Sequence, residues 1–213
     1  MDFVPSLATL TTFAGISALL AATPGPDMTL SISRALRDGK ATGLAVITGA
    51  NIGLVVHTCL VAFGISALIV ASPLAFTILK TGGAGYLAWL ALQAVRTGSN
   101  FVLSKDAPPQ SNLLAAMFNG LWVNLMNPKI IIFFMTFLPQ FISADDPHVT
   151  VKLLFLGFSF IMISLPIVIG IVLAADRLSA WLMGNRKVLR AIDYTFAGVF
   201  SLFAVKILMT HSR

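Results

Sequence analysis

The feature that most constrains this chain is its series of long apolar segments. Six of them reach the roughly 20 residues that a helix needs to cross a bilayer. They are 6–33, 42–71, 74–95, 113–142, 151–175 and 189–209. They do not alternate polar and apolar residues, which argues against the strands of a membrane barrel. The sequence therefore predicts an all-α membrane protein with six transmembrane helices.

Composition narrows the function classes. Only 10% of the residues are charged, whereas a soluble domain carries about a quarter. The net charge of +6 comes from basic residues scattered between apolar segments, so we expect no nucleic-acid partner. Cys59 is the only cysteine, which excludes an intrachain disulfide and a Cys-based zinc site. Neither HExxH nor GxSxG occurs, so we expect neither an enzyme nor a cofactor.

The basic residues of the short loops predict the orientation. Nine Lys and Arg residues follow the first, third and fifth segments, against four on the other side. Because basic loops stay in the cytoplasm, both termini are expected outside. Asp2 stands where a signal peptide needs a positive flank, so we expect the first segment to be retained.

The chain divides at its longest polar connection, 98–112, into halves of three segments each. An odd number of spans means that related halves have inverted topologies. Weak similarity between 79–96 and 189–206 supports this relation. We therefore expect one transmembrane domain over 1–213, built from two inverted three-helix repeats at about 6–97 and 113–210.

The first helix of each repeat is interrupted at proline, by ATPGPDM at 22–28 and by LMNPKI at 125–130. Proline cannot donate to the carbonyl four residues earlier, and it pushes the preceding residue out of helical geometry. Inside a membrane, such freed carbonyls persist only against protein or a water-filled cavity. Matched interruptions are typical of a transporter's central site, although a proline kink can also serve packing alone. The interrupting residues are Pro24, Gly25, Pro26, Asn127 and Pro128.

A charged residue follows each interruption, Asp27 in the first and Lys129 in the second. Each charge costs about 2.5–3.5 kcal/mol at the bilayer centre, which favours a functional role. Asp27 could instead cap a helix that resumes at Met28, accepting a backbone N–H from Thr29 or Leu30. Straight helices would place the two charges at different depths, so the sequence leaves their direct pairing open.

The second segment combines a close-packing face with polar residues. Gly49, Gly53 and His57 recur every four residues, which predicts close packing against another helix. Asn51 lies on roughly the opposite face, so this segment should be central. His57 either relays protons or makes a structural hydrogen bond. Asn124, like Asn127, either lines a pathway or satisfies freed carbonyls.

The two proline motifs, in this order and spacing, resemble those of the lysine exporter family, and more closely its homoserine/threonine-resistance branch. NPKIIIFFMTFLPQF at 127–141 and LKTGGAGYLAWLALQAVR at 79–96 contribute to the resemblance, which covers nearly the whole chain. It implies a multi-pass bacterial inner-membrane protein that exports amino acids or close derivatives, driven by the proton gradient. It leaves room for a homo-oligomer.

The residues at the breaks suit such a cargo. Lys129 and a half-helix N-terminus suit a carboxylate, while Asp27 suits an ammonium group. The freed carbonyls expected to help are those of Leu20, Ala22 and Asn124. A channel or a metal-ion exporter is the alternative, but the single exposed acid and the few His or Met clusters argue against metal selectivity.

Overall fold

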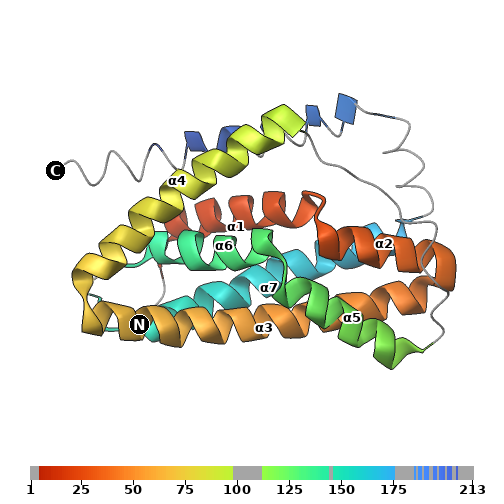
Figure 1. Cartoon of the computed structure of the whole chain (residues 1–213), viewed down its shortest axis with the longest axis horizontal. Coiled ribbons are helices and arrows are strands. Elements are labelled where there is room, and N and C mark those ends of the chain that lie inside the picture. Colours follow the sequence, from red (N-terminus) through yellow and green to blue (C-terminus); the bar gives the residue numbers. More distant parts are fainter. Residues whose placement is uncertain are drawn as a thin grey trace.

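The computed structural model describes residues 5–97, 112–143 and 146–175, with scattered residues between 185 and 205. Every regular element in these residues is helical (Figure 1). Residues 98–111, most of the predicted connection between the halves, lie outside the described part. The elements are α1 (Leu7–Ala22), α2 (Pro26–Asp38), α3 (Lys40–Ala71), α4 (Pro73–Thr97), α5 (Leu113–Leu125), α6 (Pro128–Phe137), the 3₁₀ helix η1 (Leu138–Phe141) and α7 (Val149–Leu173).

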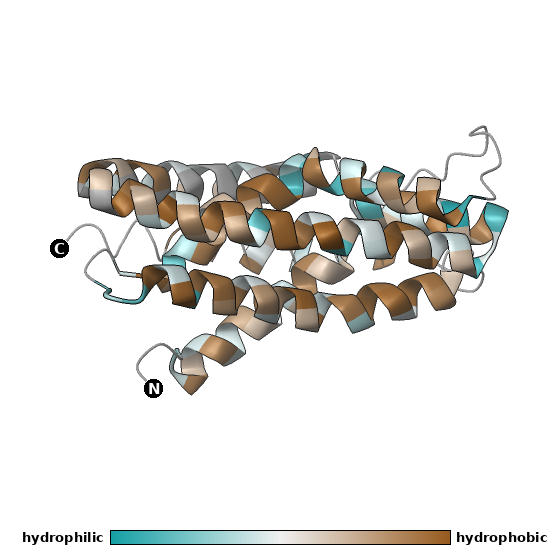
Figure 2. Ribbon diagram, turned by 90° about the horizontal axis from the view of Figure 1, so that it is seen from below, coloured by the Kyte–Doolittle hydropathy of each residue, from teal (hydrophilic) through white to brown (hydrophobic). Residues whose placement is uncertain are grey.

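Helix length and composition fit a membrane protein. α3 and α7 are each long and apolar enough to cross a membrane, and each bent pair, α1–α2 and α5–α6–η1, also qualifies as one span. The described residues thus contain up to four spans by this measure. Apolar ribbon covers most of the helical length in Figure 2. α4 covers the third predicted segment but is not among the helices that meet this test of length and hydropathy. The sixth predicted segment, 189–209, lies largely outside the described residues. The all-helical class is confirmed, and the number six stays a prediction.

The first and fourth predicted segments are both broken at their prolines. α1 and α2 meet at a bend of 51°, and α5 and α6 at a bend of 52°. The residues before the prolines, Thr23, Gly25 and Asn127, have extended backbone, as the following proline ring requires. Pro26 and Pro128 open the second half-helix in each case, where a missing N–H costs nothing.

The two broken helices run in opposite directions through the bundle. α1 lies beside α6, and α2 lies beside α5 (Figure 1). Inverted repeats need this antiparallel order for their matching helices. The repeats themselves, with the boundaries given above, stay a prediction.

α3 joins most of the described helices, packing against α2, α5 and α7 and touching α4 and α6. Glycines bring the backbones of α3 and α5 into contact. A Cβ on Gly49 would lie 1.8 Å from the Met117 carbonyl oxygen, and one on Gly120 would lie 2.1 Å from that of Val46. The close-packing face predicted for Gly49 and Gly53 is therefore confirmed, with α5 as its partner.

Two apolar clusters fill the two ends of the bundle. The aromatic cluster joins α1, α6 and α7 through Phe13, Phe133, Phe134, Phe137 and Phe160. The second cluster joins α2, α3 and α7 through Met28, Ile32, Ile47 and Val172. The helix breaks lie between them, since Leu20 and Ile130 beside the breaks belong to the first cluster and Met28 to the second.

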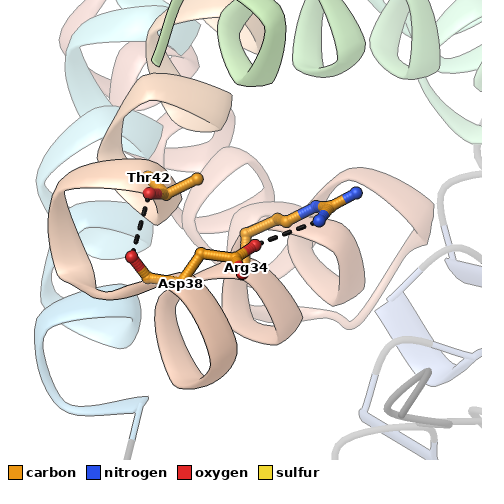
Figure 3. A network of polar contacts seen from close by, with 3 residues as sticks. All are labelled: Arg34, Asp38 and Thr42. Atoms are coloured by element: carbon orange, nitrogen blue, oxygen red, sulfur yellow. Dashed lines mark hydrogen bonds and ion pairs between the residues drawn. The ribbon is translucent and has the colours of Figure 1, made fainter. Parts of the chain in front are cut away.

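A polar turn connects α2 to α3 (Figure 3). The Arg34 guanidinium donates to the Asp38 carboxylate at 3.0 Å, and the Thr42 hydroxyl donates to the Asp38 carbonyl oxygen at 3.1 Å. Gly39 between the helices has a φ of 94°, which glycine adopts without the steric cost of a Cβ. The turn fixes α2 against the beginning of α3.

Candidate functional site

Lys129 binds the C-terminal end of α1. Its Nζ donates hydrogen bonds to the carbonyl oxygens of Leu20 at 3.0 Å and Thr23 at 2.7 Å. Pro24 deprives the Leu20 carbonyl of its usual helical donor. The last carbonyls of a helix also carry partial negative charge, so an ammonium group there is favourable. A residue of the second break thus satisfies the backbone of the first.

Asp27 receives three N–H groups. The Met28 backbone N–H and Asn127 Nδ2 donate to Oδ1 at 3.0 and 3.2 Å, and Asn124 Nδ2 donates to Oδ2 at 3.3 Å. Asn124 and Asn127 are both buried. An ionised carboxylate only accepts hydrogen bonds, so this set of donors matches it. The carboxylate of the first break therefore holds the side chains of the second.

The expected capping role of Asp27 is wrong in its details. α2 begins at Pro26 rather than Met28, and Gly25 is its N-cap residue. The Thr29 N–H bonds to the Gly25 carbonyl oxygen, and Asp27 accepts only the N–H of its neighbour Met28 from α2. The true side-chain cap lies at the second break, where Asn127 Oδ1 accepts the N–H of Lys129 at 3.0 Å.

Asp27 and Lys129 lie side by side. A Cβ built on Gly25 would be 3.2 Å from Asp27 Oδ1 and 3.6 Å from Lys129 Nζ. Within the described contacts, the two side chains share neighbours but make no direct ion pair. The different depths expected of straight helices do not occur, because both helices bend at their prolines.

A cavity of about 50 Å³ lies beside the two charges. A water molecule needs roughly 10–15 Å³ of such space, so there is room for a few waters. Leu20, Met28, Ile130 and Phe160 bring both apolar clusters to its edge. The polar residues of its lining are Thr23, Asp27, Ser31, Asn51, Asn124, Lys129 and Ser164.

His57 supports the second break from outside this lining. Its Nε2 lies 3.4 Å from the Asn124 carbonyl oxygen, and its ring centroid lies 6.0 Å from that of Phe134. Pro128 removes the helical donor that Asn124 would otherwise have. The Asn127 N–H donates to this carbonyl instead, at 3.0 Å. With its proton on Nε2, His57 adds a second donor. A part in proton relay stays a prediction.

Sequence reasoning missed three groups at this site. The Thr23 carbonyl, rather than that of Ala22, bonds to Lys129 together with the Leu20 carbonyl. Ser31 of α2 and Ser164 of α7 enter the cavity lining. Serines in helices give no specific signal, and only the packing of α2 and α7 against α3 identifies these two.

Comparison with known proteins gives a consistent picture. A protein-family model described as "LysE type translocator" matches residues 18–211. The homoserine/homoserine lactone efflux protein of Salmonella typhimurium is 34% identical over 87% of this chain and 89% of its own. The leucine efflux protein of Enterobacter sp. is 27% identical over 88% and 89%. An uncharacterized membrane protein of Vibrio cholerae is 32% identical over 83% and 85%. No solved structure matches the chain.

Proposed function

The chain belongs to the LysE type translocator family, and from this premise we propose that it exports amino acids or close derivatives, with protons entering in exchange. Membership makes it a multi-pass membrane transporter rather than an enzyme. The relatives named for homoserine and leucine efflux support an amino-acid cargo. The proposed location is the bacterial inner membrane, with both termini outside.

One observation carries the proposal: opposite charges from the two helix breaks lie beside one cavity. An amino acid carries the same two charges on adjacent groups. Lys129 Nζ would take the carboxylate, and Asp27 would take the ammonium group. The cargo ammonium group would also replace Lys129 Nζ as the donor to the Leu20 and Thr23 carbonyls, because the two ammonium groups have the same charge and the same N–H donors.

Proton coupling is assigned to Asp27. Its carboxylate alternates between the proton and the cargo ammonium, so each inward proton returns the empty site to its starting state. Asn124 and Asn127 hold the ionised form between these events. The proposed exchange therefore requires a side chain that titrates at this position.

Binding of cargo would enlarge the site. The present cavity accommodates a few waters, while homoserine has eight non-hydrogen atoms. The apolar clusters on either side would have to separate in turn to admit and release it. The bends at the two breaks are the natural place for such movement.

Transport by purified protein in liposomes tests this function. Labelled homoserine and leucine are supplied with and without an imposed pH gradient, and their accumulation is measured. We expect accumulation above the external concentration only with the gradient. Cargo that only equilibrates would identify a channel, and no movement of any amino acid would refute the proposed cargo class.

A further inference from the structure

The two oxygens of the Asp27 carboxylate are held by different numbers of donors. Oδ1 accepts two N–H groups, from the Met28 backbone at 3.0 Å and from Asn127 Nδ2 at 3.2 Å. Oδ2 accepts one, from Asn124 Nδ2 at 3.3 Å. A proton on Oδ1 would interfere with two hydrogen bonds, whereas a proton on Oδ2 would meet only one. Among the described contacts, Oδ2 is therefore the oxygen that a proton disturbs least.

Asn127 is fixed in its amide orientation. Its Oδ1 accepts the Lys129 backbone N–H at 3.0 Å while its Nδ2 donates to Asp27. Exchanging the two ends of the amide would place its NH₂ group against an N–H donor and its oxygen against a carboxylate oxygen. Both hydrogen bonds would be lost together, and the residue is 1% exposed, so bulk water does not replace them. Asn127 is thus a permanent donor to Asp27.

Asn124 is bonded at one end of its amide only. Its Nδ2 donates to Asp27 Oδ2, but its Oδ1 is buried and has no hydrogen-bond partner among the described residues. That oxygen faces α3 and lies 2.6 Å from the position of a Cβ on Gly53. Because glycine has no Cβ, this place can hold either end of the amide. The last torsion of an asparagine is broad and roughly two-fold, so exchanging the ends causes little rotamer strain.

Protonation of Asp27 would act on the two asparagines differently. A carboxyl group that gains a proton becomes a donor, and a proton on Oδ2 would point at Asn124 Nδ2, another donor. A half-turn of this amide brings Oδ1 to the place of Nδ2, where it accepts the new O–H. The proton gains an acceptor, and a buried oxygen without a donor gains one. The same half-turn is closed to Asn127 by its bond to Lys129.

We propose that the proton of the exchange binds Oδ2 of Asp27 and that Asn124 turns its amide to accept it, while Asn127 keeps its orientation. This role rests on the export function and the coupling role of Asp27 proposed above. Asn124 then stabilises both forms of the carboxyl group, and Asn127 stabilises only the ionised form. The proton arrives from the outer side on a lone pair of Oδ2 and leaves from the same atom to the inside.

The other titratable groups near Asp27 come from α6 and α3. Lys129 of α6 is the second titratable residue of the cavity lining, to which α3, α5 and α7 contribute none. His57 of α3 lies 3.4 Å from the backbone carbonyl of Asn124, so its proton does not compete for the Asn124 side chain. The ion pair of the α2–α3 turn lies at the far end of α2. A pH response of the Asn124 amide that disappears in Asp27→Asn therefore reports on Asp27.

Solid-state NMR of the full-length protein in lipid bilayers tests the amide rotation directly. With ¹³C-labelled aspartate and ¹⁵N-labelled asparagine, it measures the dipolar coupling of Asp27 Cγ to the side-chain nitrogens of Asn124 and Asn127. The two nitrogens are assigned by their loss in Asn124→Leu and Asn127→Ser. We expect acidification to weaken the coupling to Asn124 and to preserve that to Asn127. Loss of both couplings or of neither would overturn the proposal.

The transport test compares the two asparagines. Homoserine uptake by liposomes is measured over a series of proton concentrations on the side that supplies protons. Asn127→Ser keeps a capping oxygen but removes a donor to the ionised form. Half-maximal uptake should then need about tenfold less proton, the effect of one hydrogen bond of about 1.4 kcal/mol. Asn124→Leu removes one hydrogen bond from each form, so its half-maximal proton concentration should stay close to that of the parent although its maximal rate falls.

Asn119→Leu is the matched control, since Asn119 is an exposed asparagine of α5 outside the cavity lining. Its uptake should equal that of the parent in rate and in proton dependence. A tenfold shift in Asn124→Leu, in either direction, or no shift in Asn127→Ser, would overturn the different roles of the two asparagines. Uptake by the parent that ignores the proton concentration would overturn the proton exchange, and no uptake of any amino acid would overturn the export function.

Discussion

In both broken helices a proline opens the second half-helix and a charged residue follows it, Asp27 in α2 and Lys129 in α6. The bends differ by 1°, 51° against 52°. The charges differ in how they suit their own helix. A carboxylate is favourable at a helix N-terminus, whereas an ammonium group there is unfavourable. Lys129 instead reaches the C-terminal carbonyls of α1.

This difference indicates that the charge of the second break depends on the helix of the first break, whereas the charge of the first break is already favourable on its own helix. Asp27 lies in the first turn of α2, where a carboxylate is favourable even without its bonds to Asn124 and Asn127. Lys129 owes its hydrogen bonds to another helix, so a rearrangement of α1 against α6 changes its surroundings most. The predictions below separate the two breaks on this basis, beginning with the largest effect.

Replacing Lys129 should have the greatest consequence. Lys129→Met leaves the Thr23 carbonyl without this donor, at a cost of about 1–3 kcal/mol. The Leu20 carbonyl loses Lys129 but keeps the Thr23 N–H at 3.2 Å. We expect transport to fall at least about a hundredfold and the melting temperature in detergent to drop. Lys152→Met, which removes the lysine that pairs with Asp146 from the first turn of α7, is the control. Parent-like transport by Lys129→Met would remove Lys129 from the proposed site.

Asp27→Asn should separate coupling from folding. Asparagine retains the shape and one acceptor oxygen but cannot titrate. We expect the variant to insert and fold, to lose gradient-driven accumulation, and to keep slow exchange of labelled cargo. Uptake with and without a pH gradient measures this. Asp38→Asn, at the α2–α3 turn, controls for loss of an acid. If uptake by the variant responds to the pH gradient as uptake by the parent does, Asp27 does not carry the proton and His57 is the next candidate.

Restoring the helices should have a moderate effect. Pro24→Ala combined with Pro26→Ala, and separately Pro128→Ala, allow backbone hydrogen bonds that the prolines prevent. We expect insertion to persist and transport to slow about tenfold. Pro128→Ala should be the slower variant, because Lys129 needs the bend to reach the carbonyls of α1. Pro166→Ala, at an exposed position within α7, is the control. Unchanged rates would leave the prolines a packing role only.

Gly53 tests how closely the second break is held. A Cβ on Gly53 would lie 2.6 Å from Asn124 Oδ1, so Gly53→Ala must displace the side chain that bonds to Asp27. Overpacking of this kind costs about 1–3 kcal/mol. Gly64→Ala meets nothing within 4 Å and should be neutral. Melting temperature and transport rate measure both variants, and equal behaviour would contradict the packing argument.

The smallest effect is expected at the Asp146–Lys152 pair, outside the breaks. Burial acts to raise the pKa of Asp146, but hydrogen bonds from Lys152 and the His148 backbone lower that pKa below its usual value overall. The pair therefore stabilises the protein above the ordinary Asp pKa and loses this contribution as pH falls through the lowered value. Asp146→Asn should cost less than about 1 kcal/mol at pH 7. Melting temperatures from pH 7 to pH 3 should show a shallower decline than in the parent.

What the sequence could predict was local. Segment length and proline position determine the helices and their breaks, since both act through the backbone within a few residues. The packing face of Gly49 and Gly53 follows from helical periodicity alone. These features could be predicted without knowledge of any tertiary contact.

What it could not predict depends on how helices meet. Lys129 reaches Thr23 only because both helices bend, and the sequence states no bend angle. Ser164 lines the cavity with Asn51 only because α7 packs against α3. Asp27 illustrates the limit well, because a shift of two residues in the helix start, from Met28 to Pro26, changes a cap into a first-turn acceptor.

The neighbouring charges of Asp27 and Lys129 have a consequence for electrical work. With both side chains ionised they add no net charge to the cavity, and a zwitterionic amino acid adds none either. In the proposed exchange, membrane voltage therefore does no net work on the loaded site and acts on the proton alone. At about 2.3 kcal/mol per charge for each 100 mV, its contribution to the proposed export would come entirely through that proton.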